Sequence, residues 1–170
     1  MPLTTNNVSY ASYTTLATVN LQTLSTSATV GWSGTRVDNQ TSVKALDYEI
    51  FLKLPTANTA PANDQAVYLY ISPGITTDGG TTWLQADQGT TTLPVSADTG
   101  STIASPNNLK LLGILNYKTQ NMVMQGQFLL SNAVGQFMPD GWIPIIINYC
   151  GAALSNGCIF AYRAITETNQ

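Results

Sequence analysis

The segment KALDYEIFLKL, residues 44–54, has the alternation of a β-strand that is buried on one face. Successive side chains of a strand point to opposite faces of its sheet, so every second residue shares a face. One face collects Leu46, Tyr48, Ile50, Leu52 and Leu54, and the other collects Ala45, Asp47, Glu49, Phe51 and Lys53. Pro55 follows, and proline cannot donate a hydrogen bond to a neighbouring strand. The segment therefore predicts a half-buried strand that ends at the Leu54-Pro55 step.

The rest of the chain keeps the same period of two, and helical spacing is almost absent. Further strands are predicted at residues 17–22, 28–32, 66–72, 91–95, 109–117, 122–130, 142–150 and 158–165. Residues 118–121 would join two of these strands as a hairpin, and residues 131–137 have room for one helical turn. Many short strands between Gly, Pro and Asn turns are typical of a β-sandwich or barrel. We therefore expect an all-β fold over residues 1–170, a single-domain antiparallel β-sandwich of jelly-roll type, with residues 1–14 as a candidate N-terminal arm.

The composition excludes most kinds of catalytic site. Only 15 of the 170 residues are charged, six Lys or Arg and nine Asp or Glu, whereas Ser, Thr, Asn and Gln supply 60. There is no histidine, which removes Ser-His-Asp and Cys-His catalysis and His-bearing zinc sites. Two cysteines are too few for a four-thiolate zinc site. We therefore expect a protein that is not an enzyme and has no catalytic residue, cofactor or metal.

The charge distribution and the N-terminus bear on partners and location. No cluster of Lys or Arg is present to bind phosphates, so neither nucleic acid nor an anionic membrane is expected as a partner. The N-terminal MPLTTNNVSYASYTT has no basic region and no apolar core of a secretory signal. No apolar run approaches the roughly 18 residues of a membrane helix. We expect synthesis in a cytoplasm.

Four motifs occur in order along the chain. They are GWSGTRVDNQTS with the following ALDYEIFLKL (residues 31–42 and 45–54), AVYLY (66–70), NLKLLG (108–113) and FLLSNAVGQFMPDGWIPIIINYCGAAL (128–154). The ordered set resembles a widespread group of small virion structural proteins of tailed phages, over most of residues 17–165. The resemblance implies a jelly-roll decoration or cement protein on the capsid surface, often a trimer, that binds the major capsid protein. The sequence departs from the group at Cys150 and Cys158, where the group usually has Thr-Gly-type loops.

Three functions are compatible with these features. The leading one is a capsid decoration subunit, made in the host cytoplasm and located on the virion. The second is the receptor- or glycan-binding head of a phage fibre or spike, which would use exposed aromatic side chains. A hydrolase is a distant third. Edges rich in Thr and Asn without Lys are a liability in a monomer, so we expect a homo-oligomer, with a trimer favoured.

Cys150 and Cys158 flank the loop GAALSNG between two predicted strands. They could form a disulfide across a hairpin once the particle leaves the reducing cell. We favour the alternative of two half-buried thiols that act as small apolar side chains. The spacing is not that of a C-x-x-C redox motif.

Two groups of carboxylates are candidates for chemistry. Asp78, Asp87 and Asp98 lie in the Gly- and Thr-rich centre of the chain and are candidate Ca²⁺ ligands, although aspartates that form turns are the commoner explanation. Asp47 and Glu49 share one face of a strand, at a separation of about 6–7 Å along it, as a glycosidase acid pair could. For this pair we favour a solvated or interface face.

The three tryptophans are candidate contact residues. Trp142 opens a strongly apolar strand and is expected in the core, whereas Trp83, on a polar segment after Gly79-Gly80, is the best candidate for an exposed aromatic side chain. Trp32 is the third candidate for stacking on a sugar. An exposed Trp83 would suit an interface, where Trp and Tyr are enriched. Asp38-Asn39 is expected to form a turn.

Overall fold

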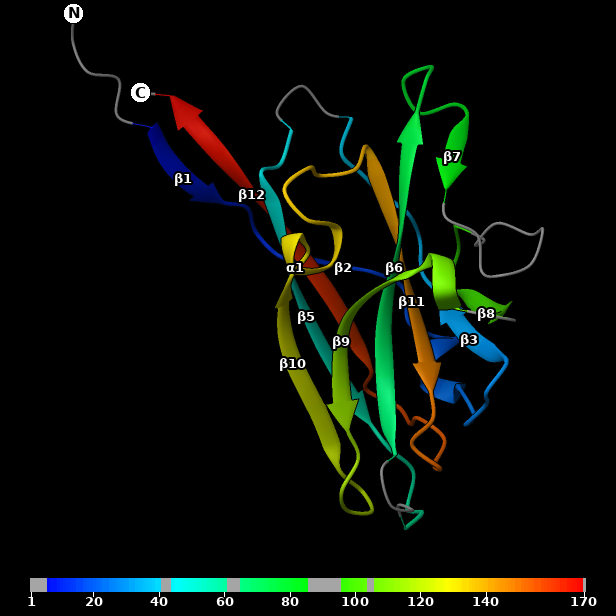
Figure 1. The fold of residues 1–170 in the computed structure, drawn as a ribbon. Coiled ribbons are helices and arrows are strands. Elements are labelled where there is room, and N and C mark those ends of the chain that lie inside the picture. Colours follow the sequence, from blue (N-terminus) through cyan, green and yellow to red (C-terminus); the bar gives the residue numbers. More distant parts are fainter. Residues whose placement is uncertain (1–5, 41–43, 61–64, 86–95, 104–105, 170) are drawn as a thin grey trace, which may run out of the picture.

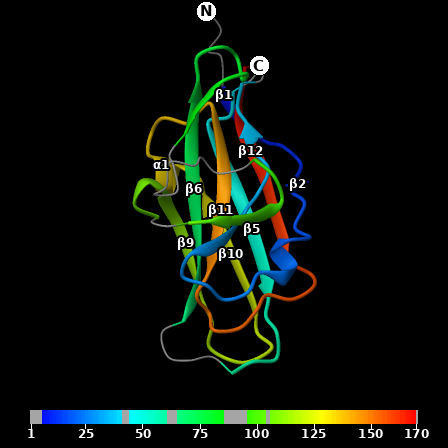
Figure 2. The same ribbon diagram turned by 90° about the vertical axis from the view of Figure 1, so that its right-hand side faces the viewer.

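The computed structural model describes residues 6–40, 44–60, 65–85, 96–103 and 106–169, and within them two antiparallel sheets face each other (Figure 1). The first sheet has the order β1-β12-β5-β10, with β2 also paired to β12. Its strands are β1 (Asn6–Tyr10), β2 (Thr14–Thr15), β5 (Asp47–Pro55), β10 (Val123–Leu129) and β12 (Ile159–Asn169). In Figure 2 the strands β9 and β6 of the second sheet lie to the left and β12 of the first sheet to the right.

The second sheet has the order β7-β6-β11-β3-β8, with β9 also paired to β6 and β4 to β11. Its strands are β3 (Val30–Ser33), β4 (Val37–Asp38), β6 (Ala66–Thr76), β7 (Trp83–Gln85), β8 (Thr99–Thr102), β9 (Lys110–Asn116) and β11 (Gly141–Asn148). The predicted all-β, antiparallel sandwich is confirmed, and its jelly-roll type stays a prediction. The predicted strand at residues 91–95 lies outside the described residues.

Helical residues are confined to three short elements of the described chain. These are the 3₁₀ turns η1 (Leu21–Thr23) and η2 (Pro106–Asn108) and the single turn α1 (Ser131–Val134). The turn expected in residues 131–137 is therefore confirmed. None of the described helices combines the length and the hydropathy that a bilayer span requires.

The core between the sheets follows from the alternation of β5. Tyr48, Ile50, Leu52 and Leu54 are buried, while the side chains between them are partly exposed. Trp142 of β11 lies at the centre of an aromatic cluster, with its ring 5.6 Å from that of Tyr48, 5.7 Å from Tyr162 and 6.4 Å from Phe160. The core position predicted for Trp142 is confirmed. Leu46 was expected on the same face but is exposed, because the strand begins only at Asp47.

Strand β11 is buried on both faces, in contrast to β5, whose side chains alternate between buried and partly exposed. It pairs with β6 along its whole length and on its other side with β4 and then β3. The ladder on this second side has a gap between Trp142 and Ile145, where Gly34 donates to the carbonyl of Pro144 (3.0 Å). A proline is tolerated in this central strand because it lies in that gap, where a missing N–H removes no ladder bond.

The strand predicted at residues 17–22 is wrong. Ala17 and Val19, which should have shared the buried face, are exposed, while Thr18 is buried and donates to the carbonyl of Cys158 (3.0 Å). Asn20 donates from its backbone and from its side chain to Asp98. Through these bonds the segment contacts distant parts of the chain instead of pairing as a strand, and it ends in the turn η1.

The predicted hairpin across residues 118–121 is also wrong. Strand β9 pairs with β6, whereas β10 pairs with β5, so the connection crosses from one sheet to the other. The ring of Phe128 on β10 packs against Gly113 of β9 and Gly126, close enough that a Cβ at either glycine would collide with it. Both β9 and β10 have buried side chains among exposed or partly exposed ones. This pattern looks the same whether two consecutive strands pair as a hairpin or lie in different sheets, so the sequence could not distinguish the two.

The candidate N-terminal arm contains a strand. Within it, β1 runs antiparallel to the end of β12, with Val8 opposite Glu167 and Tyr10 opposite Ile165. Beyond Ile165, the last residue of β12 that is paired to β5, the two strands form a ribbon that projects from the sandwich (Figure 1). Residues 1–5 lie outside the described part of the chain.

The close approach of β3 and β11 at Gly31 gives a test of the packing. A Cβ at this position would lie 2.6 Å from the carbonyl oxygen of Ile146 and 2.4 Å from Cδ1 of Ile103. Because the backbone of a central strand cannot move away cheaply, Gly31→Ala should lower the free energy of unfolding by about 1–3 kcal/mol in urea titration. The matched control is Gly100→Ala on β8, where no heavy atom lies within 4 Å. It should change stability by less than about 0.5 kcal/mol, and equal losses in both variants would contradict this packing.

Candidate functional site

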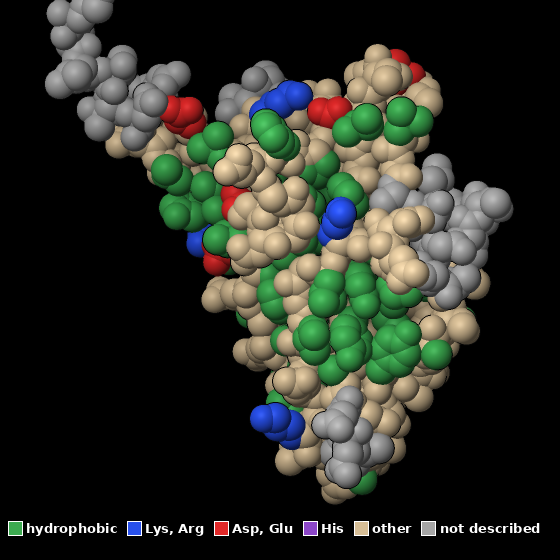
Figure 3. All heavy atoms as spheres, viewed as in Figure 1, with side chains coloured by type: hydrophobic (Ala, Val, Ile, Leu, Met, Phe, Trp, Pro, Cys, Tyr) green, Lys and Arg blue, Asp and Glu red, His purple; other side chains and the backbone are tan. Residues whose placement is uncertain are grey.

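The outer face of the seven-stranded sheet carries a second apolar layer. Register places Tyr68 beside Ile114 and Ile147, and Tyr70 beside Leu111 and Ile145. Beneath this surface the side chains of Ile103, Leu109, Ile143, Ile145 and Ile147 form a buried cluster that is separate from the main core. We call the surface formed by Tyr68, Tyr70, Leu111, Ile114 and Tyr149 the tyrosine face. It is the hydrophobic area over β9, β6 and β11 in Figure 3.

The three tyrosines pack against one another as a group. The ring of Tyr68 stacks on that of Tyr70 at 6.3 Å and meets Tyr149 edge to face at 5.4 Å. Burial raises the pKa of Tyr70, and the neighbouring Tyr149 and Tyr68 add to the effect. The hydroxyl of Tyr149 donates to the carbonyl of Ala28 (3.1 Å). The rings are therefore held in place by packing before any partner arrives.

The tyrosine face carries no charge of its own. Among the described residues of β3, β6, β8, β9 and β11, those that register places on this side of the sheet are Tyr, Ile, Leu, Ala, Ser, Thr, Asn and Gly. Leu111 and Ile114 are 45% and 46% exposed, which leaves large apolar side chains in water beside the rings. Exposed contiguous apolar patches on soluble proteins commonly mark sites of contact with another molecule.

Sequence reasoning missed the tyrosine face, although two signals for it are present. The run Ile145, Ile146 and Ile147 has no alternation, which is typical of a strand covered on both faces. Residues 66–70 also place apolar residues on one face and tyrosines on the other. Together these patterns indicate a sheet with two apolar sides.

The two cysteines are free and buried, as the favoured interpretation expected. The thiol of Cys150 contacts the carbonyl of Ala152 at 3.1 Å, and that of Cys158 contacts the carbonyl of Ser155 at 3.3 Å. Burial raises the pKa of Cys158 to about 11 and also raises the pKa of Cys150. Both are therefore protonated and poorly nucleophilic near neutral pH.

The carboxylates suggested for calcium serve separate loops. Asp78 accepts hydrogen bonds from the backbone N–H of Thr81 (3.1 Å) and Thr82 (2.7 Å), and the bonds from Thr82 lead in lowering its pKa. Asp98 accepts from the indole N–H of Trp32 at 2.6 Å. Asp87 lies outside the described residues. Among the residues that are described, no group of three or more His, Cys, Asp or Glu side chains could hold a metal ion.

Asp47 and Glu49 do share a face of β5, but each has its own partner. Asp47 accepts from the hydroxyl (2.6 Å) and the backbone N–H (3.0 Å) of Ser131 at the start of α1. Glu49 lies opposite Arg163 of β12, and its Oε2 accepts from Nε at 2.6 Å and from Nη2 at 2.5 Å. This arrangement is that of an interstrand ion pair and a helix-start contact.

The tryptophans are less available than the sequence suggested. Trp32 is fully buried with its indole N–H on Asp98. Trp83 is only partly exposed, because the guanidinium of Arg36 covers one side of its ring at 4.3 Å and Gly141 lies against its edge. Trp83 is therefore the most exposed of the three tryptophans, but it is only partly exposed. Its position follows from glycines that let the ring approach the sheet, a contact that local sequence does not reveal.

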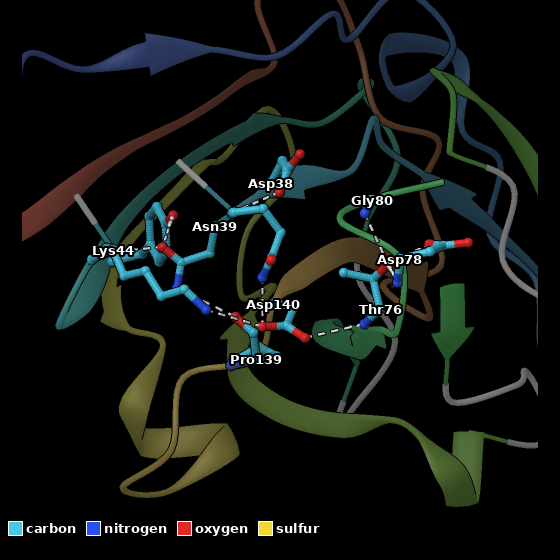
Figure 4. A network of polar contacts seen from close by, with 11 residues as sticks. Asp38, Asn39, Lys44, Thr76, Asp78, Gly80, Pro139 and Asp140 are labelled. Carbon is cyan, nitrogen blue, oxygen red and sulfur yellow. Dashed lines mark hydrogen bonds and ion pairs between the residues drawn. The ribbon is translucent and has the colours of Figure 1, made fainter. Parts of the chain in front are cut away.

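A polar network at one end of the sandwich was only partly anticipated (Figure 4). The expected turn is present, since Asp38 accepts from the backbone N–H of Gln40 (2.8 Å). Asn39, however, is buried, and its side chain accepts from Ala45 N–H (2.8 Å) and from the hydroxyl of Tyr48 (3.0 Å). This single amide thereby fixes the loop before β5 to the core.

Asp140 joins three loops in the same network (Figure 4). Its carboxylate accepts from the Gln40 amide at 2.5 Å and from the Thr76 backbone N–H at 3.1 Å, and it pairs with Lys44 at 3.5 Å. The bond from Thr76 is the main reason that the pKa of Asp140 is lowered. The site is a structural clamp between the ends of β4, β6 and β11.

No family model, curated protein or solved structure matches the chain. The site must therefore be interpreted from its own geometry. The charged and polar clusters described above are engaged within the fold, whereas the tyrosine face presents ordered apolar side chains to solvent. Its chemistry is that of contact and burial.

The lowered pKa of Asp140 predicts a pH effect with a definite sign. A carboxyl group with a depressed pKa in the folded state stabilises the fold above its ordinary pKa, and this stabilisation is lost as pH falls through the lower, folded value. Asp140→Asn should therefore reduce the fall in thermal midpoint between neutral and acidic pH. The control is Glu167→Gln on the exposed end of β12. Identical acid dependence in wild type and Asp140→Asn would contradict the role of this carboxylate.

Proposed function

We propose that this chain is a structural subunit of a virus particle, a decoration or cement protein on the capsid surface of a tailed phage, made in the host cytoplasm. Its partner is the major capsid protein, and it acts without catalysis, cofactor or metal. The observation that carries the proposal is the tyrosine face, an ordered and uncharged apolar surface on the outside of a β-sandwich.

The order of strand pairing supports a jelly-roll topology. In chain order, eight strands pair from the outside inward: β1 with β12, β3 with β11, β5 with β10, and β6 with β9. This nesting is what a long antiparallel hairpin produces when it rolls into two facing sheets, and it builds two Greek keys. Jelly rolls serve as capsid and lectin domains, so the topology agrees with the proposal without determining it.

The composition of the tyrosine face supports protein as its partner. The centres of protein interfaces are enriched in aromatic residues and depleted in charge. Tyr68, Tyr70 and Tyr149 are already ordered by mutual packing, so their burial costs little side-chain entropy. Neutral contacts of this kind are also insensitive to the ionic strength outside a cell, because salt screens mainly exposed charges.

The mechanism follows from mass action. A subunit that binds the assembled shell and not its separated parts stabilises the shell, by an amount that grows with concentration relative to Kd. Contact across a boundary between capsomers would raise the free energy needed to separate them. The chain needs no chemistry for this role, only a rigid apolar face.

The second candidate function remains the head of a fibre or spike, and copy number separates the two. A decoration protein should be present in hundreds of copies per particle, whereas a fibre head is rare. Quantitative mass spectrometry of purified particles measures this number. The hydrolase alternative loses its support, because Glu49 is committed to Arg163 and Asp47 to Ser131.

The tyrosine face is tested by binding to capsids assembled without the chain. The double variant Leu111→Glu, Ile114→Glu places charges on exposed positions, so it should fold, but binding in a cosedimentation assay should weaken by roughly tenfold or more. The control is Leu84→Glu, a leucine on β7 outside the tyrosine face that is 59% exposed. Equal binding by both variants and wild type, or a handful of copies per particle, would contradict the proposal.

We further propose that the isolated chain forms a homo-oligomer, most simply a trimer, through neutral contacts and sheet edges. Strand β10, at an edge of the first sheet, has no charged residue along Val123–Leu129. Raising salt from about 0.1 M to 1 M shortens the Debye length from about 10 Å to 3 Å and should leave such an oligomer intact. Light scattering at both concentrations checks this. A monomer at both would refute the oligomer, and dissociation at high salt would refute its neutral contacts.

A further inference from the structure

The outer face of the first sheet, opposite the tyrosine face, holds two adjoining grooves. One has a volume of about 530 Å³ and is lined by Tyr10, Glu49, Gln127, Asn132 and Arg163 among others. The other has a volume of about 360 Å³ and is lined by Tyr13, Phe51, Gln127 and Ala161. Gln127 borders both. The register confirms the arrangement, since Leu129, Glu49 and Arg163 form one row across β10, β5 and β12, and Gln127, Phe51 and Ala161 form the next.

Arg163 lies between two exposed aromatic rings. Its guanidinium carbon is 4.7 Å from the ring centre of Tyr10 and 4.8 Å from that of Tyr13. The two tyrosines are still 57% and 43% exposed. Glu49 fixes the guanidinium through a single oxygen, and this bond is the main cause that raises the pKa of Arg163. The result is a rigid platform of two rings around one ion pair.

The polar groups beside this platform have unused bonding capacity. A guanidinium has five N–H donors, and Glu49 engages it at Nε and Nη2 only. Within the described residues, no hydrogen bond involves the side-chain amides of Gln127 and Asn132 or the second carboxylate oxygen of Glu49. Donors and acceptors are thus mixed at one place, next to aromatic rings.

We propose that this surface is a binding site for neutral oligosaccharides. A sugar presents apolar C–H faces, which pack on aromatic rings, and hydroxyl groups that both donate and accept, which amides and a carboxylate–guanidinium pair can satisfy together. The charges of Arg163 and Glu49 cancel, so the site offers no net attraction to an acidic sugar. The larger groove falls within the usual range of ligand sites, about 300–1,000 Å³.

The site adds an adhesive function to the proposed structural one. Both grooves lie on the first sheet, so a subunit attached through the tyrosine face of the second sheet keeps them exposed. Each open groove should bind weakly, with Kd on the order of 1 mM, because most of the ligand stays in water. Many copies on one particle would bind a glycan-coated surface through avidity.

The test is a titration of the full chain with neutral trisaccharides of glucose, galactose, mannose and N-acetylglucosamine, followed by NMR, with sialyllactose as the acidic comparison. We expect saturable binding of at least one neutral trisaccharide and weaker binding of sialyllactose. Gln127→Ala and Asn132→Ala should each weaken binding about fivefold, as expected for one lost hydrogen bond. Both side chains are at the surface, so folding should be retained.

The matched control is Gln125→Ala, which changes the same residue type on the same face of β10, one row away beside Lys53. It should bind like wild type. No saturable binding of any neutral trisaccharide would overturn the proposal, as would tighter binding of sialyllactose or equal losses in all three variants. Capsid binding is measured separately, so either function can fail without the other.

Discussion

Strand β11 packs against side chains on both of its faces, and the arrangement of the two sheets depends on that packing. Its inward residues Trp142 and Ile146 belong to the core between the sheets. Its outward residues Ile143, Ile145 and Ile147 are covered by the tyrosines and by Ile103 and Leu109. A strand with only one apolar face would leave this sheet with a polar exterior. The second layer makes the exterior a surface suited to contact.

Glycine and proline allow this double packing. Gly31 on β3 has no side chain on the outer face, and Ile103 fills that space above the backbone of Ile146. Pro144 lies where the ladder from β11 passes from β4 to β3, so its missing N–H is not needed there. Both residues would be unfavourable inside an ordinary strand. Here they lie where β11 packs closely against β3 and Ile103.

The fold class could be predicted from the sequence because alternation is a local signal. The burial of Tyr48, Ile50, Leu52 and Leu54 follows directly from it. The pairing partner of a strand is not a local property of the sequence. The spacing of β9 and β10 suits a hairpin, yet β9 pairs with β6 and β10 pairs with β5, in different sheets. Residues 17–22 differ for another reason, because Thr18 is buried and donates to the carbonyl of Cys158, 140 positions along the chain, and local alternation cannot reveal such a contact.

The candidate sites were harder to foresee, because they combine residues from distant strands. Neither the pairing of Glu49 with Arg163 nor the position of Tyr10 and Tyr13 beside it follows from local spacing. Several of the few charges serve such defined contacts, as at Asp140, which joins three loops. The two outer faces are left with different chemistry: apolar and uncharged on one sheet, aromatic and polar on the other.

The central claim is that the tyrosine face is the attachment surface, and hydroxyl-radical footprinting of the chain, free and bound to capsids, tests it most directly. The method reports the solvent exposure of individual side chains. Our account predicts that Tyr68, Tyr149, Leu111 and Ile114 become protected on binding, while Tyr10 and Tyr13 keep their reactivity. Protection of Tyr10 and Tyr13 with an unchanged tyrosine face would contradict it.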